Sequence, residues 1–295
     1  MRFGVVILPD ERWRDGARRW RRAEELGFDH AWTYDHIAWG TLRDSTWFGA
    51  VPTLASAALT TDRITLGTLV ASPNFRHPVS FARELISLDD LSQGRFVLGI
   101  GAGGIGWDAT VLGQEAWSPR ERADRFAEFV ELTDLLLREP ATTFDGRFYS
   151  ADNAPTMPGC VQVPRLPFAI AATGPRGMRL AARYGQTWVT TGDRAGVTEA
   201  LDAAAGAEVM RTQGRLLDDA CAAIGRDPAS IRRLVLLGTR LDPGLQSVES
   251  CRATVAQYHD AGATDLVGHW PRASSPFATD PAIFERIFSD FASPY

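Results

Sequence analysis

Lysine is absent from the 295-residue chain, because all 31 basic residues are arginine. A chain without lysine side chains cannot form the Schiff bases, pyridoxal phosphate adducts or P-loop contacts that need this amine. Enzyme classes built on an active-site lysine are therefore excluded.

Cysteine is scarce, and the three residues present, Cys160, Cys221 and Cys251, are widely spaced. An odd number without a CxxC pair indicates neither a disulfide framework nor a thiolate metal site. The histidines likewise show no ligand spacing on one element, so no metal is expected. Unpaired cysteines are typical of a reducing compartment, and we expect a cytoplasmic protein.

Long apolar runs are also missing. No stretch approaches the roughly 18 residues of a membrane span, and "MRFGVVILPDERW" at the N-terminus has too short an apolar run for a signal peptide. A formal net charge of -5 gives no basic surface for nucleic acid. We therefore expect a small-molecule substrate, with no nucleic-acid or membrane partner.

Short apolar runs, by contrast, alternate with segments of helical periodicity along the whole chain. Eight strand–helix units are predicted, with strands at 2–8, 29–34, 63–70, 95–101, 167–172, 187–191, 231–240 and 265–270. Strands that are apolar on both faces indicate a parallel sheet covered by helices. Eight units favour closure into an α/β (β/α)8 TIM barrel, which we expect to form one domain over residues 1–295.

Residues 140–166 interrupt this pattern between the fourth helix and the fifth strand. An Asp-Gly pair between short β-prone runs is typical of a hairpin, and a proline-rich stretch follows it. We expect an insertion near the barrel mouth and not a separate domain.

Catalytic side chains of such barrels lie at the C-terminal ends of the strands. The stretch "TYDHIAW" (33–39) ends the second strand and carries Asp35, His36 and Trp39. An acid, a group that exchanges a proton near neutral pH and a flat stacking surface would thus face the mouth. A lone histidine is often structural, as we expect for His30, so both interpretations of His36 stay open here.

Two further stretches follow strands. In "VLGIGAGGIGW" (97–107) the glycines permit close approach of a ligand to the backbone, although the spacing matches a dinucleotide fingerprint poorly. In "AATGPRG" (171–177), Thr173 and Gly174 precede a helix that begins with proline, which suits either a phosphate or an ordinary turn.

Taken together, these stretches resemble the bacterial-luciferase-like flavin and deazaflavin oxidoreductases, particularly their F420-dependent branch. The resemblance covers nearly the whole chain, and its most specific block is "RITLGTLVASPNFRHPVSFARELISLDDLSQGRFVLGIGAG" (63–103). It implies a luciferase-like barrel with coenzyme F420 at its mouth, hydride transfer to or from the ring, and a homodimer.

The resemblance also implies residue roles. Asp35 would hydrogen-bond the ring, His36 would exchange the proton and Trp39 would wall the substrate pocket. The peptide between Leu69 and Val70 would be cis and support the back of the ring. The cofactor would be approached through the backbone of Gly101, Ala102 and Gly103. Its side chain or phosphate would be bound by Ala172, Thr173 and Gly174.

The chain departs from the sugar-phosphate dehydrogenases of this family at two positions. Gly104 stands where they carry a glutamate, and Asp193 stands where they carry a lysine that binds the substrate phosphate. Glucose-6-phosphate is therefore a poor candidate substrate. Two alternatives stay open: an FMN-dependent monooxygenase of the same fold, and a non-catalytic barrel that binds a flavin.

Overall fold

The computed structural model describes residues 1–104, 106–192 and 200–292. Eight strands form a closed barrel in the order β1-β10-β9-β8-β7-β4-β3-β2, and the neighbouring strands for which a register is established run parallel. The predicted (β/α)8 fold is confirmed. The barrel strands are β1 (Arg2–Val6), β2 (His30–Thr33), β3 (Thr65–Thr68), β4 (Phe96–Ile100), β7 (Phe168–Ala171), β8 (Thr187–Thr190), β9 (Arg232–Leu236) and β10 (Asp265–His269).

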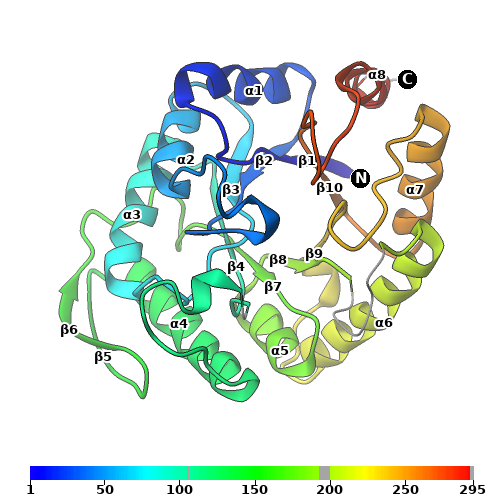
Figure 1. The fold of residues 1–295 in the computed structure, drawn as a ribbon. Coiled ribbons are helices and arrows are strands. Elements are labelled where there is room, and N and C mark those ends of the chain that lie inside the picture. The colour runs from blue at the N-terminus through cyan, green and yellow to red at the C-terminus, as the bar shows by residue number, and fades with distance from the viewer. Residues whose placement is uncertain (105, 193–199, 293–295) are drawn as a thin grey trace. The chain divides into compact units, whose positions relative to one another are not determined.

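Helices follow the barrel strands, as Figure 1 shows. They are α1 (Trp13–Glu25), α2 (Ala50–Ala58), α3 (Pro78–Leu91), α4 (Pro119–Arg138), α5 (Pro175–Tyr184), α6 (Ala203–Ala222), α7 (Val248–Asp260) and α8 (Pro281–Ala292). Three short 3-10 turns among the described residues were not predicted: η1 (Gly40–Leu42), η2 (Trp107–Ala109) and η3 (Pro228–Ser230). Among the described residues, no helix is long and apolar enough to cross a membrane.

Internal contacts divide the chain into two compact units. The first comprises Met1–Ile7, Arg18–Trp32 and Ala172–Tyr295, and the second comprises Leu8–Ala17 and Thr33–Ala171. The expectation of one domain over 1–295 therefore stays a prediction.

The second unit carries the predicted insertion. Strands β5 (Ala141–Asp145) and β6 (Ser150–Pro155) form an antiparallel hairpin that lies outside α3 and α4 in Figure 1. The Glu128 carboxylate on α4 accepts hydrogen bonds from the backbone N–H groups of Arg147, Phe148 and Tyr149 at 3.0, 2.8 and 2.6 Å. One helix side chain thus holds the hairpin turn in place.

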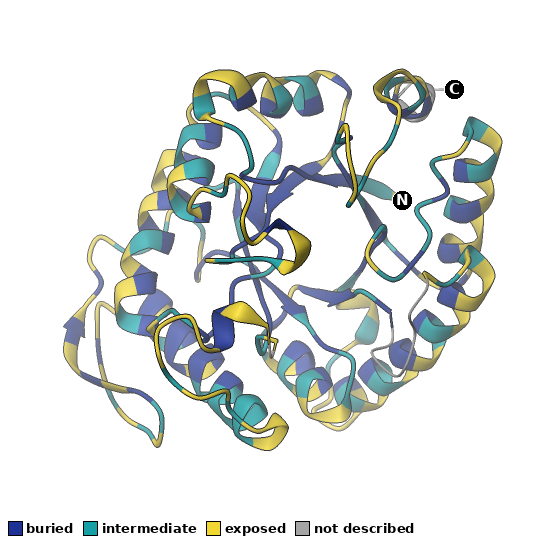
Figure 2. Cartoon of the chain, viewed as in Figure 1, coloured by how far each residue is buried: buried dark blue, intermediate teal, exposed yellow. Residues whose placement is uncertain are grey.

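In the first unit, buried polar groups tie the starts of β2 and β10 together. The indole N–H of Trp32 donates to His30 Nδ1 at 2.7 Å, and His30 Nε2 lies 3.0 Å from Asp265 Oδ1. Arg232 donates to both oxygens of Asp265. His30 is therefore a structural residue, as expected from the sequence. Figure 2 shows the barrel strands coloured mainly as buried.

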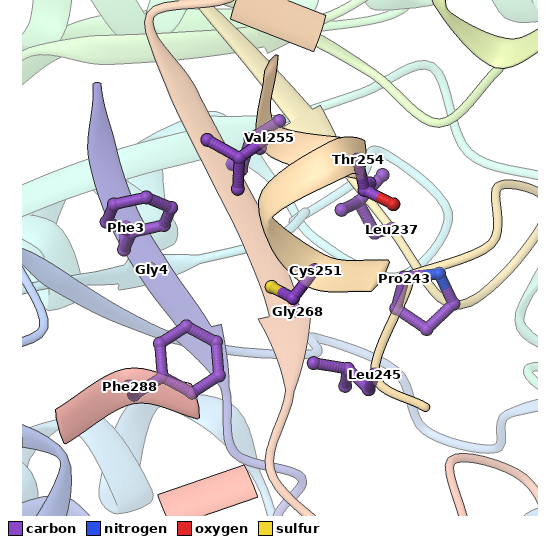
Figure 3. Close-up of a pocket in the computed structure, with 11 residues that line it drawn as sticks. Phe3, Gly4, Leu237, Pro243, Leu245, Cys251, Thr254, Val255, Gly268 and Phe288 are labelled. Atoms are coloured by element: carbon purple, nitrogen blue, oxygen red, sulfur yellow. The ribbon is translucent and has the colours of Figure 1, made fainter. Parts of the chain in front are cut away.

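A small apolar pocket of about 20 Å³ lies beside β1, β10 and α7, as Figure 3 shows. Gly4, Gly268 and Cys251 are among its lining residues. The volume suits about one methyl group or one water molecule. The pocket is a packing defect on the helix side of these strands.

Candidate active site

Hydrogen bonds hold the ends of β2, β3 and β4 side by side. Leu69 N–H donates to the Thr33 carbonyl at 2.9 Å, and Ala71 N–H donates to the Gly99 carbonyl at 2.8 Å. Gly101 N–H then donates to the Ala71 carbonyl at 2.9 Å. Because the strands are parallel, the segments that follow them leave at the same edge of the sheet.

His36 and Asp108 form a pair across this edge. Asp108 lies in η2 after β4, is 4% exposed, and accepts a hydrogen bond at Oδ2 from His36 Nδ1. Its other oxygen accepts the backbone N–H groups of Ile37 and Ala38 at 2.9 and 3.0 Å. One buried carboxylate therefore orders the loop after β2 and orients its imidazole. Engagement of Nδ1 leaves Nε2 for proton exchange with a ligand.

Aromatic side chains lie beside this histidine, and the Tyr34 ring packs edge-on against it with ring centroids 5.8 Å apart. Trp39 packs against Tyr34, with ring centroids 5.2 Å apart, and lies nearly parallel to Trp47 at 6.5 Å. The Trp47 indole N–H donates to the His36 carbonyl at 2.8 Å. Trp39 therefore belongs to an aromatic wall beside His36, and its predicted role at the substrate pocket stays a prediction.

The Asp35 side chain is buried and faces Arg76. Arg76 Nε and Nη2 donate to its two oxygens at 2.5 and 2.8 Å, while Nη1 donates to Glu84 at 2.7 Å. Such bidentate pairing is strong and directional. The Asp35 side chain therefore holds Arg76, and its predicted hydrogen bond to a bound ring stays a prediction.

The peptide between Leu69 and Val70 is cis, as the resemblance implied. Beside it, Gly101 lacks a side chain where a Cβ would lie 3.0 Å from Val70 Cγ2. Gly103 has a φ of +76°, and a Cβ there would lie 2.5 Å from Asn74 Oδ1. The backbone at Gly101 thus lies close to Val70, and the backbone at Gly103 lies close to Asn74. The predicted contact of Gly101, Ala102 and Gly103 with a cofactor stays a prediction.

Ala172, Thr173 and Gly174 belong to the first unit and precede α5. The Ala172 carbonyl accepts the Trp188 indole N–H at 2.8 Å. Gly174 is the N-cap of α5 and supplies no side-chain hydrogen bond, so the helix N-terminus is open to an anion. The predicted contact of these residues with a cofactor stays a prediction.

Sequence reasoning missed Asp108, Arg76 and Trp47. Asp108 follows a glycine-rich stretch without periodicity, and only its position shortly after a strand end could have drawn attention to it. Asp193 lies outside the described residues. Among the described residues, no group of three or more His, Cys, Asp or Glu side chains is placed to hold a metal ion.

The chain belongs to the luciferase-like monooxygenase family, whose sequence profile matches residues 1–261. Its closed barrel and its cis Leu69–Val70 peptide agree with the resemblance found in the sequence.

Curated relatives include two kinds of enzyme. An F420-dependent glucose-6-phosphate dehydrogenase from Beutenbergia cavernae is 36% identical over 170 residues, which cover 57% of this chain and 50% of the relative. A 4-hydroxyprotoasukamycin monooxygenase from Streptomyces nodosus subsp. asukaensis is 36% identical over 179 residues, which cover 59% and 45%. The matches therefore span about half the length of these relatives.

Among solved structures, an F420-dependent secondary alcohol dehydrogenase in complex with an F420-acetone adduct is similar with a TM-score of 0.81. The alignment covers 98% of this chain and 97% of that chain at 18% identity. A likeness at this level of identity establishes a shared fold.

Proposed function

We propose that the protein is an F420-dependent oxidoreductase that transfers a hydride between coenzyme F420 and a small organic substrate. The observation that carries this proposal is the His36–Asp108 pair beside the backbone-lined end of β3 and β4. The relatives named as F420-dependent dehydrogenases support the choice of cofactor.

The residues that would contact the ring half of such a cofactor lie just after β3 and β4. At Gly101 and Gly103 a Cβ would collide with Val70 and Asn74, so glycine at these positions lets the backbone after β4 pack closely against the segment after β3. We infer that Leu69, Val70 and the 101–103 backbone hold the ring, and that Ala172, Thr173 and Gly174 hold its phosphate-bearing side chain.

F420, when bound, would supply or accept the hydride. The protein's own contribution is the movement of a proton and the placement of the substrate. His36 would give or take the proton at Nε2, while Asp108 fixes the ring orientation and stabilises the imidazolium form. Arg76 and Asp35 keep the loop after β2 anchored to the end of β3.

An FMN-dependent monooxygenase is the rival proposal, and the similarity to 4-hydroxyprotoasukamycin monooxygenase favours it. A non-catalytic flavin carrier would have no use for an oriented imidazole at the barrel mouth, so the His36–Asp108 pair weighs against it. We do not propose glucose-6-phosphate as the substrate, because Gly104 and Asp193 replace the glutamate and lysine expected for that substrate.

We also infer that residues 1–295 act as one catalytic domain, that the protein works in the cytoplasm and that it forms a homodimer. Unpaired Cys160, Cys221 and Cys251 support the reducing compartment. Sedimentation at micromolar concentration tests the dimer, and a monomer would contradict it.

Equilibrium binding separates F420 from FMN without any knowledge of the substrate. Oxidised F420, reduced F420 and FMN are each titrated into the purified protein, and binding is followed by fluorescence. We expect one form of F420 to bind at least tenfold more tightly than FMN. Tighter binding of FMN would overturn the choice of cofactor and favour the monooxygenase.

A further inference from the structure

The insertion hairpin of β5 and β6 contacts the segments that follow β3 and β4. Its turn carries two neighbouring aromatic side chains, Phe148 and Tyr149. The Phe148 ring packs edge-on against Trp117, with centroids 5.6 Å apart, and the Tyr149 ring packs edge-on against His77 at 5.4 Å. Trp117 lies between η2 and α4, and His77 is the N-cap of α3. The insertion therefore packs against both segments.

Arg125 on α4 connects this contact to the end of β3. Its guanidinium lies 5.6 Å from the centroids of both the Trp117 and the Tyr149 rings. Its Nη2 donates to the Pro73 carbonyl at 2.6 Å. A hydrogen bond from a charged donor is shorter and stronger than one between neutral groups. Because Pro73 follows Val70 closely in sequence, this bond holds the chain just beyond the peptide that we propose to support the ring.

The same contact reaches the glycine-rich segment through Asn74. This residue is 6% exposed, and its Nδ2 donates to the Gly104 carbonyl at 3.4 Å. A Cβ on Gly103 would lie 2.5 Å from Asn74 Oδ1, so the two segments are closely packed here. Movement of Pro73 would therefore displace the 103–104 backbone as well.

No carboxylate competes for the Arg125 guanidinium. Among the described residues it forms no ion pair, and Glu128, one turn along α4, instead accepts the backbone N–H groups of the hairpin turn. The orientation of the guanidinium is thus set by two aromatic rings and one carbonyl. Both rings depend on the hairpin, since Tyr149 belongs to it and Trp117 packs against Phe148.

We propose that the insertion hairpin positions the backbone after β3 and β4 for the cofactor, and that Arg125 is the positioning residue through which it acts. This inference rests on the proposed function, because that backbone is where F420 is proposed to bind. A segment that is already held in its bound conformation loses less conformational freedom on binding, so the affinity is higher.

Two substitutions of Arg125 test this role. Methionine keeps a long apolar stem between the two rings but has no donor for the Pro73 carbonyl. Lysine keeps a charged donor, and this contact uses a single nitrogen. Titration with F420, followed by fluorescence well below the melting temperature, should show about tenfold weaker binding by Arg125→Met and binding within about threefold of the parent by Arg125→Lys. Equal binding by the parent and Arg125→Met would overturn the proposal.

A further variant tests the hairpin itself. Phe148→Ala removes the ring that packs against Trp117 and should weaken F420 binding by about threefold or more. Arg147→Met is the matched control on the same turn, because the Arg147 side chain is 65% exposed and its guanidinium lies 4.8 Å from the centroid of the Phe148 ring. The control should bind F420 like the parent.

The variants also separate positioning from direct contact. Weaker binding by Arg125→Met with parent-like binding by Phe148→Ala would assign Arg125 to the cofactor itself and contradict the role of the hairpin. Equal weakening by Arg125→Met and Arg125→Lys would exclude the hydrogen bond to Pro73 as the link, which also contradicts the proposal.

Thermal unfolding of each sample shows whether the variant is folded. If Arg125→Met does not fold, the comparison of Phe148→Ala with Arg147→Met decides the question. Failure of the parent to bind F420 would contradict the proposed function. Binding by the parent that Arg125→Met and Phe148→Ala leave unchanged would contradict only the role of the hairpin.

Discussion

Asp108 is the residue on which the candidate site depends most. Its two oxygens accept three hydrogen bonds, all from the segment 36–38. A neutral amide could keep the backbone contacts, but it could not stabilise an imidazolium to the same extent. Asp108 is thus a positioning residue that acts through His36.

We predict that Asp108→Asn keeps the fold and binds F420 within about threefold of the parent. Turnover should fall by roughly tenfold to a hundredfold, because the imidazole is no longer held by a carboxylate. Asp44→Asn is the control, because the Asp44 side chain is 95% exposed. Turnover equal to that of the parent in Asp108→Asn would show that the carboxylate does not assist His36.

Two other histidines make stability depend on pH. Burial lowers the pKa of His30, and burial lowers the pKa of His269 to about 3. Both titrate near pH 6.5 in the unfolded chain, so the unfolded state binds more protons below that pH. Each neutral imidazole contributes to the free energy of unfolding. This contribution is fully present above about pH 6.5 and is lost as the pH falls toward the native pKa.

We therefore predict that the free energy of unfolding decreases between pH 6.5 and 4, with His269 contributing up to about 1.4 kcal/mol per pH unit. His30 adds to the decrease in the same direction. Urea midpoints measured across this range give the slope. His269→Asn should make it shallower, whereas His259→Asn should not, since the His259 side chain is 67% exposed. A midpoint that stays constant from pH 7 to 5 would refute the assignment.

At the scale of elements, the loop from β4 to α4 depends on one glycine. Gly103 has a positive φ, and a Cβ there would press on the Asn74 amide. Gly103→Ala should lower the free energy of unfolding by about 1–2 kcal/mol and weaken F420 binding.

Gly104→Ala is the matched control one residue along, where a Cβ would meet only the Gly106 nitrogen at 3.7 Å. Thermal unfolding measures the stability of both variants, and titration with F420 measures their cofactor binding. Equal effects of the two substitutions would show that the 101–103 backbone has no special role.

Strands β1 and β10 offer a second matched pair beside the pocket of Figure 3. A Cβ on Gly268 would enter open space, whereas a Cβ on Gly4 would overlap the His30 ring. Gly268→Ala should therefore stabilise by about 0.5–1 kcal/mol, and Gly4→Ala should destabilise by about 1–3 kcal/mol. Chemical denaturation measures both, and a destabilising Gly268→Ala would contradict this account of the pocket.

For the whole molecule, the barrel was predictable because each strand is a short run buried on both faces, as in "RFGVV" of β1 and "FAIA" of β7. The hairpin was predictable from its Asp-Gly turn. The cis peptide at Leu69–Val70 was predicted only from the resemblance, since no residue in "LGTLVASP" indicates a cis peptide.

The site was predictable only in part, for a physical reason. His36 closely follows the second strand and could be placed from the sequence, but its partner is 72 residues away in sequence and reaches it through tertiary packing. The role of the Asp35 side chain could not be predicted either, because nothing in the sequence shows that its carboxylate pairs with Arg76.

The central claim is that this barrel transfers a hydride with F420 while His36 moves the proton. Its most direct test follows the oxidation state of F420 by absorbance, with ketones offered to the reduced cofactor and alcohols to the oxidised one. The account predicts substrate-dependent turnover in the parent. His36→Ala should bind F420 within about tenfold of the parent and turn over roughly two orders of magnitude more slowly. Near-normal turnover in His36→Ala would contradict the account.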